Sequence, residues 1–364
     1  MGNSYTSLTT MDQNDVVREK MRNSMSFRDP SLAPEKRAAH DDVINALTVV
    51  RPGMILSGSR DTKIVLTNTD IGETALSWEG HEKEVTKLAY RNTVAKHTIL
   101  SGSRDHTINM WMFNSPNPAR TFTGHKLIVS GLANIDEQSF MSGSRDTTVK
   151  LWDIEKSKEL RSITLNRNLV THIAYNQTAG LAAQTSEDKC VKIWNPKNMQ
   201  LVHSFPLKNH IQLFCEFVDE NTVLSCSNGF NGEGGEITVY DLRMMKQLRE
   251  LRGHEGSVTC LAMLPVNENR KLVVSVGADR TIRLWRLDEG TLLWTEDAPF
   301  EADSMQCCAY NDGHIIVSGG KGRLAHLQAK TQCGRIALET AWIQSTTKIK
   351  VSTMTASKSY QRLK

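Results

Sequence analysis

The stretch Ser142-Gly143-Ser144-Arg145-Asp146-Thr147-Thr148-Val149-Lys150-Leu151-Trp152-Asp153 places a tight polar turn between two short β-like runs. This pattern is typical of two antiparallel strands joined at one end. Related stretches occur at residues 57–68 (SGSRDTKIVLTN), 101–111 (SGSRDHTINMW), 184–195 (QTSEDKCVKIWN) and 275–285 (SVGADRTIRLW). The chain is therefore built from an internal repeat.

The residue that closes each unit gives the period of the repeat. The closing positions are Thr67, Trp111, Trp152, Trp194, Tyr240 and Trp285, at steps of 44, 41, 42, 46 and 45 residues. A period in the forties, with several short strands in each unit, is typical of propeller blades. Because one blade cannot bury its own faces, the whole array is expected to fold as one unit.

Three Gly-His pairs support this interpretation: Gly80-His81, Gly124-His125 and Gly253-His254. Each histidine precedes by four residues a valine that should open an inner strand. Over residues 40 to 342 the chain resembles WD40 repeats. The resemblance implies an all-β, seven-bladed WD40 β-propeller over residues 39–342. A disordered N-terminal arm (1–38) would precede it, and a basic, Ser/Thr- and Lys-rich tail (343–364) would follow.

The seven predicted blades differ in regularity. Their expected ranges are 43–78, 85–122, 129–165, 170–205, 211–251, 258–294 and 304–343. The fourth has Leu165-Asn166 in place of Gly-His, and the seventh lacks the Asp and the Trp. Residues before His40 show no strand pattern, so we expect the C-terminal segment 334–342 to supply the last outer strand.

Composition narrows the functional classes. A net charge of +4 is too mild to indicate nucleic-acid binding by itself. The seven cysteines show no C-x-x-C spacing and are interpreted as reduced packing thiols of a cytoplasmic protein. No apolar run approaches the roughly 20 residues of a membrane span, and the N-terminus has no signal-peptide core. No motif implies a metal or cofactor.

The N-terminus Met1-Gly2-Asn3-Ser4-Tyr5-Thr6 matches the N-myristoylation pattern M-G-x-x-x-[ST]. Gly2 is the predicted lipidation site; the alternative is an unmodified N-terminus. One myristoyl chain gives only weak, reversible membrane contact. Because no cysteine and no clean polybasic run lies nearby, stable membrane residence would require a protein partner.

One repeat holds the residue types of a catalytic triad: His125, Ser142 or Ser144, and Asp146. The same residue types recur in other repeats, whereas a catalytic set occurs once. WD repeats hold a buried Asp-His-Ser-Trp hydrogen-bond chain, so the resemblance implies a structural role. The predicted structural tetrads include His81, Asp105 and Trp111; His125, Asp146 and Trp152; and His254, Asp279 and Trp285.

The position before the tetrad aspartate is expected on a propeller rim where partners dock. It holds Arg60, Arg104 and Arg145 in three successive blades, then Glu187. Arginine binds carboxylates bidentately, so an acidic protein segment is the predicted ligand. The alternative is that this exposed position simply tolerates arginine.

The Gly-rich turn 228–235 lacks the lysine and helix start of a phosphate loop. It is interpreted instead as a protruding contact loop that carries Phe230. The candidate partner-binding residues are thus the three arginines, Glu187 and Phe230.

Several stretches depart from the generic repeat: 169–172, 184–189, 210–212 and 226–230 with 232–234. They resemble a branch of WD-repeat proteins associated with cilia. This resemblance implies a non-enzymatic adaptor in cilium assembly and in trafficking of ciliary membrane or intraflagellar transport components, acting as a monomeric propeller within a complex. The alternative is a substrate receptor of a cullin-type ubiquitin ligase, since Tyr240-Asp241-Leu242-Arg243 approaches the Trp-Asp-x-Arg of such receptors.

Overall fold

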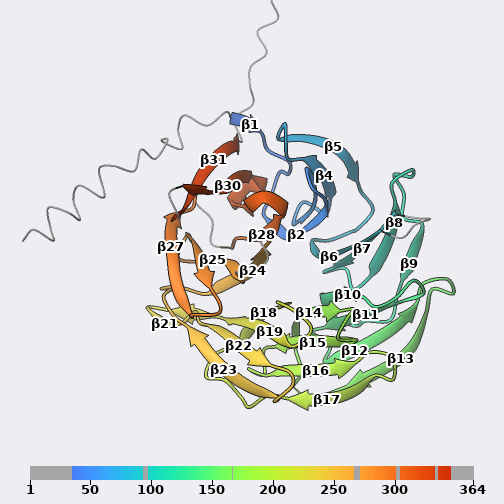
Figure 1. Cartoon of the computed structure of the whole chain (residues 1–364). Coiled ribbons are helices and arrows are strands. Elements are labelled where there is room, and N and C mark those ends of the chain that lie inside the picture. Colours follow the sequence, from blue (N-terminus) through green and yellow to red (C-terminus); the bar gives the residue numbers. More distant parts are fainter. Residues whose placement is uncertain are drawn as a thin grey trace, which may run out of the picture.

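The computed structural model describes residues 35–92, 97–165, 167–265, 271–300, 304–332 and 335–345. Within these residues, seven sheets of four or five strands stand in a ring around a central axis, and consecutive strands in each are antiparallel (Figure 1). The predicted all-β, seven-bladed propeller is thereby confirmed. Gly2, nearly all of the predicted arm and nearly all of the predicted tail lie outside the described residues.

Each blade is a meander that runs from the axis outward. Blade 1 comprises β2 (Ile44–Arg51), β3 (Met54–Ser59), β4 (Ile64–Asn68) and β5 (Glu73–Trp78). Blade 2 comprises β6 (Val85–Asn92), β7 (His97–Ser103), β8 (Ile108–Met112) and β9 (Arg120–Phe122). Blade 3 comprises β10 (Val129–Asn134), β11 (Ser139–Ser144), β12 (Thr148–Asp153) and β13 (Lys158–Thr164). Blade 4 comprises β14 (Val170–Asn176), β15 (Leu181–Ser186), β16 (Val191–Asn195) and β17 (Gln200–Ser204).

The last three blades are less uniform. Blade 5 comprises β18 (Gln212–Phe217), β19 (Thr222–Ser227), β22 (Ile237–Asp241) and β23 (Lys246–Leu251), with a small hairpin of β20 (Gly229–Phe230) and β21 (Glu233–Gly234) between β19 and β22. Blade 6 comprises β24 (Val258–Leu264), β25 (Leu272–Gly277), β26 (Thr281–Arg286) and β27 (Thr291–Asp297). Blade 7 comprises β28 (Cys307–Tyr310), β29 (His314–Ser318), β30 (Leu324–Gln332) and β31 (Arg335–Ser345), with short 3-10 turns η2 (Asn311–Gly313) and η3 (Gly320–Gly322). No helix in the described ranges has the length and apolar character needed to span a membrane.

Hydrogen bonds join the inner strands of neighbouring blades. The second residue of an inner strand sends its side chain to a backbone carbonyl of the next blade. Asn45 Nδ2 donates to Val85 O at 2.9 Å, and Thr259 Oγ1 donates to Met305 O at 2.6 Å. Thr86, Ser130 and Thr171 make the equivalent bonds. Each of these polar side chains therefore stabilises the contact between two blades.

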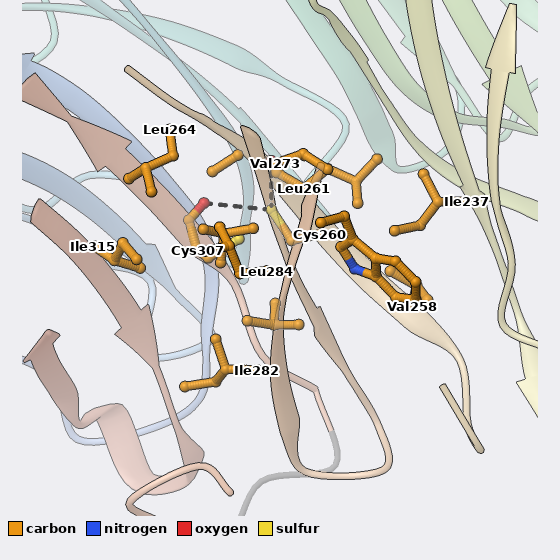
Figure 2. Close-up of a cluster of buried hydrophobic side chains, with 14 of the residues drawn as sticks. Ile237, Val258, Cys260, Leu261, Leu264, Val273, Ile282, Leu284, Cys307 and Ile315 are labelled. Atoms are coloured by element: carbon orange, nitrogen blue, oxygen red, sulfur yellow. Dashed lines mark hydrogen bonds between the residues drawn. The ribbon is translucent and has the colours of Figure 1, made fainter. Parts of the chain in front are cut away.

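The hydrophobic core lies between the blades. Figure 2 shows one such cluster, which extends from Ile237 of blade 5 through Leu261 of blade 6 to Ile315 of blade 7. The Cys260 thiol donates to the Cys307 carbonyl across the contact between blades 6 and 7, at 3.4 Å. All six cysteines in the described ranges are buried and free, as the packing interpretation predicts. The seventh, Cys333, lies outside these ranges.

The ring closes differently from the sequence-based expectation in one respect. As predicted, the C-terminal segment supplies the fourth strand of blade 7, as β31. The expectation that no strand precedes His40 is wrong, because β1 (Glu35–Arg37) pairs in parallel with β31 as a fifth strand. The free edge of β31 supplies the hydrogen-bonding groups, so three charged residues without a strand pattern become a strand.

Gln344 connects the three segments that meet at the closure. Its side chain is buried; its Oε1 accepts from Ala39 N at 3.0 Å and from Leu324 N at 3.1 Å, and its Nε2 donates to Gly72 O at 3.3 Å. One amide thus links the N-terminal segment, blade 7 and blade 1. We name this contact between blades 7 and 1 the closure seam.

A histidine at the closure seam should make stability depend on pH. His326 Nδ1 donates to Thr69 O at 3.1 Å, while Nε2 accepts from His314 Nδ1 at 2.8 Å. Burial, reinforced by the charge of His314, lowers the pKa of His326 to about 4. The unfolded chain therefore binds a proton that the folded chain excludes, and stability falls as the pH drops from about 6.5 toward 4.

We expect the free energy of unfolding to fall by on the order of 2 kcal/mol through this group between pH 7 and pH 5. Urea midpoints at the two pH values measure the loss. His326→Gln keeps a donor and an acceptor but does not titrate, so its midpoint should change less between the two pH values. An unchanged pH dependence in His326→Gln would assign the effect elsewhere.

Candidate partner-binding face

A buried hydrogen-bond chain runs through blade 3. Trp152 Nε1 donates to Ser142 Oγ at 2.7 Å, Ser142 Oγ donates to His125 Nε2 at 2.7 Å, and His125 Nδ1 donates to Asp146 Oδ2 at 3.0 Å. The same chain occurs in blade 2 (Trp111, Ser101, His81, Asp105) and in blade 6 (Trp285, Ser275, His254, Asp279).

These chains do not have the geometry of an accessible catalytic triad. Ser142 is fully buried, and its oxygen already accepts from Trp152. Asp146 also accepts from the backbone amides of Lys126 and Thr148, at 2.8 and 2.9 Å. A substrate therefore has no access to the serine, and the chain instead holds the turn against the blade.

Two blades carry variants of this chain. In blade 1, His40 bonds to Ser57 and Asp61, but Thr67 stands where the other blades have tryptophan and its hydroxyl is buried without a partner. In blade 4, Trp194 donates to Gln184 Oε1, and Gln184 Nε2 donates to Asn168 Oδ1 at 2.6 Å. The sequence pattern places Leu165-Asn166 at the Gly-His position of this blade. It does not predict the paired amides of Gln184 and Asn168.

The three arginines occupy equivalent positions on one face of the ring. This face carries the turns between the second and third strands of the blades, and we call it the turn face. Arg60 N donates to Val43 O at 2.9 Å, Arg104 N to Glu84 O at 2.9 Å, and Arg145 N to Ile128 O at 3.0 Å. The side chains are 50, 53 and 44% exposed, respectively.

Two glutamates pair with these arginines: Glu84 lies between Arg60 and Arg104, and Glu187 lies beside Arg145. Glu84 Oε1 is 3.6 Å from Arg60 Nε and 3.3 Å from Arg104 Nη1, and Glu187 Oε1 is 2.5 Å from Arg145 Nη2. The sequence did not reveal these ion pairs. Because they are exposed to water, each contributes little to stability, and the arginines stay available to a partner's carboxylates.

Phe230 lies on the same turn face, at the hairpin of β20 and β21. Gly232 N donates to Glu255 O at 3.0 Å, and Ser257 Oγ bonds to both backbone groups of Gly229 at 3.1 Å. The hairpin is thus tied to blade 6 while the Phe230 side chain stays 78% exposed. An exposed aromatic ring on a held loop is a common contact residue in protein interfaces.

The turn face therefore combines arginines, glutamates and one exposed aromatic ring. Lys83 and Lys126 are also exposed beside it. Within the part of the chain that the structure describes, no group of three or more His, Cys, Asp or Glu side chains is placed to hold a metal ion. The chemistry of this face suits recognition of a carboxylate-bearing protein surface.

Comparison with known proteins agrees with this geometry. Three segments match the repeat model "WD domain, G-beta repeat", at residues 72–112, 116–153 and 245–286. The three complete hydrogen-bond chains lie inside these segments. The WD40 β-propeller domain of Doa1 has a similar fold, with a TM-score of 0.67 and 24% identity over 82% of this chain and 98% of that chain. The fold is thus that of a WD-repeat propeller.

Similarity to curated proteins is more limited. The chain is 31% identical over 106 residues to p21-activated protein kinase-interacting protein 1-like of Danio rerio, covering 29% of this chain and 28% of that protein. The Gallus gallus protein of the same name is 25% identical over 155 residues, covering 42% of this chain and 40% of that protein. WD repeat-containing protein 36 of Homo sapiens is 27% identical over 128 residues, covering 35% of this chain and 13% of that protein. The matches span between 13% and 40% of the lengths of these relatives.

Proposed function

We propose that this chain is a non-enzymatic adaptor whose turn face binds an acidic segment of a protein partner. The WD40 propeller fold favours a protein-interaction scaffold, but fold alone does not select the partner. The observation that supports an acidic ligand is the placement of Arg60, Arg104 and Arg145 on one face of three adjacent blades, each about half exposed. Glu84 and Glu187 hold the guanidinium groups in position, which lowers the entropy that they lose on binding.

The proposed setting is cilium assembly and the trafficking of ciliary membrane or intraflagellar transport components. Its basis is the similarity of segments such as 184–189 and 226–230 to WD repeat-containing protein 31. N-myristoylation of Gly2 is part of the same proposal and would add weak, reversible membrane contact. Neither propeller geometry nor the curated relatives supply this cellular assignment.

A defined peptide tests the binding face. We expect a glutamate-rich peptide to bind the wild-type chain with an affinity that falls as salt is raised, because the contacts are between exposed charges. The triple variant Arg60→Glu, Arg104→Glu, Arg145→Glu should bind at least about tenfold more weakly in calorimetric titration. Its thermal midpoint should stay near that of the wild type, since exposed ion pairs contribute little.

A matched control reverses the same number of positive charges at positions away from the turn face. Lys158→Glu, Lys197→Glu and Lys246→Glu reverse three exposed lysines outside the turn face of blades 3, 4 and 5. This triple variant should bind the peptide nearly as the wild type does. Equal weakening by both triples would show that only net charge matters, and the assignment to the turn face would fail.

Localisation tests the cellular setting. A C-terminally tagged chain should concentrate at the cilium or its base in ciliated cells, and Gly2→Ala should disperse it. If both forms mark the cilium, the propeller surface directs localisation and lipidation is dispensable. If neither does, the ciliary assignment is wrong.

A second candidate is a substrate receptor of a cullin-type ubiquitin ligase. The observation that favours it is Arg243, which is 72% exposed at the end of β22, in the sequence Tyr240-Asp241-Leu242-Arg243. Co-purification of the ligase's propeller adaptor with wild type, and its loss in Arg243→Ala, would support this candidate. Absence of the adaptor from the wild-type preparation would exclude it.

A further inference from the structure

The seven inner strands surround a cavity of about 480 Å³ on the propeller axis. A cavity of this size accommodates a side chain or a small molecule. Part of its lining is small and apolar: Ala46, Ala89, Ala133, Ala174 and Ala262. Two charged side chains interrupt this lining, Lys87 of β6 and Glu216 of β18.

Lys87 reaches across the cavity. Its Nζ lies 5.5 Å from the centre of the Phe214 ring, which belongs to blade 5, three blades away. His172 of blade 4 packs on the same ring, with 3.9 Å between ring centres. Among the described residues, no carboxylate lies within ion-pairing distance of the Lys87 ammonium, and burial lowers its pKa.

Glu216 does not neutralise Lys87. It follows Phe214 by two residues on β18, which places its backbone about 6–7 Å further along the strand. Burial raises the pKa of Glu216 to about 7, and no cation of the described chain offsets this. The cavity thus holds one cation and one carboxyl group at different depths, each without an ionic partner inside the described protein.

We propose that the central cavity is a carboxylate-binding site in which Lys87 supplies the counter-ion. Lys87 is partly buried, and a cation in such a site without an ionic partner is unfavourable. A bound carboxylate removes that penalty through a charge-assisted hydrogen bond. The Phe214 ring and the alanines line the space around it. Glu216 disfavours a second negative group deeper in the cavity, so the site selects a single carboxylate.

The carboxylate has two possible sources: a small free acid or a partner's Glu or Asp side chain. Lys87 lies three residues after Glu84, which pairs with Arg60 and Arg104 on the turn face. A segment bound there is therefore close enough to place an acidic side chain beside Lys87. This second form rests on the proposed function, whereas binding of a free acid does not.

The test uses the full chain and two probes in ligand-observed NMR. One probe is sodium propionate; the other is a capped pentapeptide, Gly-Ser-Glu-Ser-Gly, compared with its Gln counterpart. We expect saturable binding of propionate, of the Glu peptide, or of both, weakened at least about tenfold by Lys87→Met. Lys87→Arg should retain binding, and Lys158→Met, which removes an exposed lysine outside the turn face, should not weaken it.

The variants separate a loss of folding from a loss of binding, and they separate a free acid from a partner's acidic side chain as the source of the carboxylate. Lys87→Met should have a thermal midpoint equal to or above that of the wild type, since it removes a partly buried charge that has no ionic partner among the described residues. Glu-peptide binding that requires both Lys87 and the three arginines identifies a partner side chain; propionate binding that survives arginine reversal identifies a free acid. Equal binding by wild type and Lys87→Met, or no binding of either probe, overturns the proposal. Loss of glutamate-rich peptide binding in the arginine triple but not in Lys87→Met would exclude a partner side chain as the source of the carboxylate while leaving the proposed function intact.

Discussion

Replacing Asp146 with alanine is expected to lower the free energy of unfolding by about 3–5 kcal/mol, the range for removing one partner of a buried ionic group. Its side chain is only 5% exposed and accepts hydrogen bonds from His125, Thr148 and two backbone amides. Alanine leaves these donors buried without acceptors, and each unmet donor costs about 1–3 kcal/mol.

The same aspartates should make the propeller sensitive to acid. Burial by itself would raise the pKa of Asp146, but the hydrogen bonds from His125, Thr148 and the backbone outweigh it and hold the pKa well below its usual range. The pKa values of Asp105 and Asp279 are lowered in the same way. Because the folded pKa lies below the unfolded one, this stabilisation is full above about pH 5 and is lost as the pH falls further.

Urea denaturation of Asp146→Ala, with Asp288→Ala as the control for an exposed aspartate, measures the effect. The control should stay within about 0.5 kcal/mol of wild type. Trp152→Phe loses the indole N–H and part of the buried ring volume, and should cost at least about 1 kcal/mol. If Asp146→Ala behaved like Asp288→Ala, the chain of hydrogen bonds would not stabilise the blade.

Trp342→Ala should also cost about 3–5 kcal/mol, because it removes a large buried ring at the closure seam. Trp342 is 3% exposed, and its Nε1 donates to Thr69 O at 2.6 Å. Gly72 has a φ of +70°, and a Cβ there would lie 3.0 Å from the Trp342 ring. The glycine thus allows both the turn and the close approach of blade 7 to blade 1.

Loss of this ring should open the propeller at its one seam between the two ends of the sequence. We expect faster limited proteolysis near the seam together with a lower thermal midpoint. Trp294→Ala, at a half-buried tryptophan in the outer strand β27, is the matched control and should have a smaller effect on both. If the two variants lose equal stability, the closure seam has no special role.

The sequence by itself determined the number of blades, the residues of the buried chains and the C-terminal origin of the last outer strand. These features depend on patterns that every blade must satisfy within about forty residues: alternating burial along strands and a polar turn closed by its own side chains. The partners of His125, Asp146 and Trp152 were predictable because they lie within one repeat.

Only the tertiary structure decided the contacts between distant segments. β1 is a strand because the edge of β31 offers backbone partners, although Glu35–Arg37 has no strand pattern of its own. Glu84 lies between two arginines of adjacent blades, and Lys87 reaches a ring three blades away. Each depends on how the ring brings separate repeats together; a repeat read alone contains no information on what faces it across a neighbouring blade or across the axis.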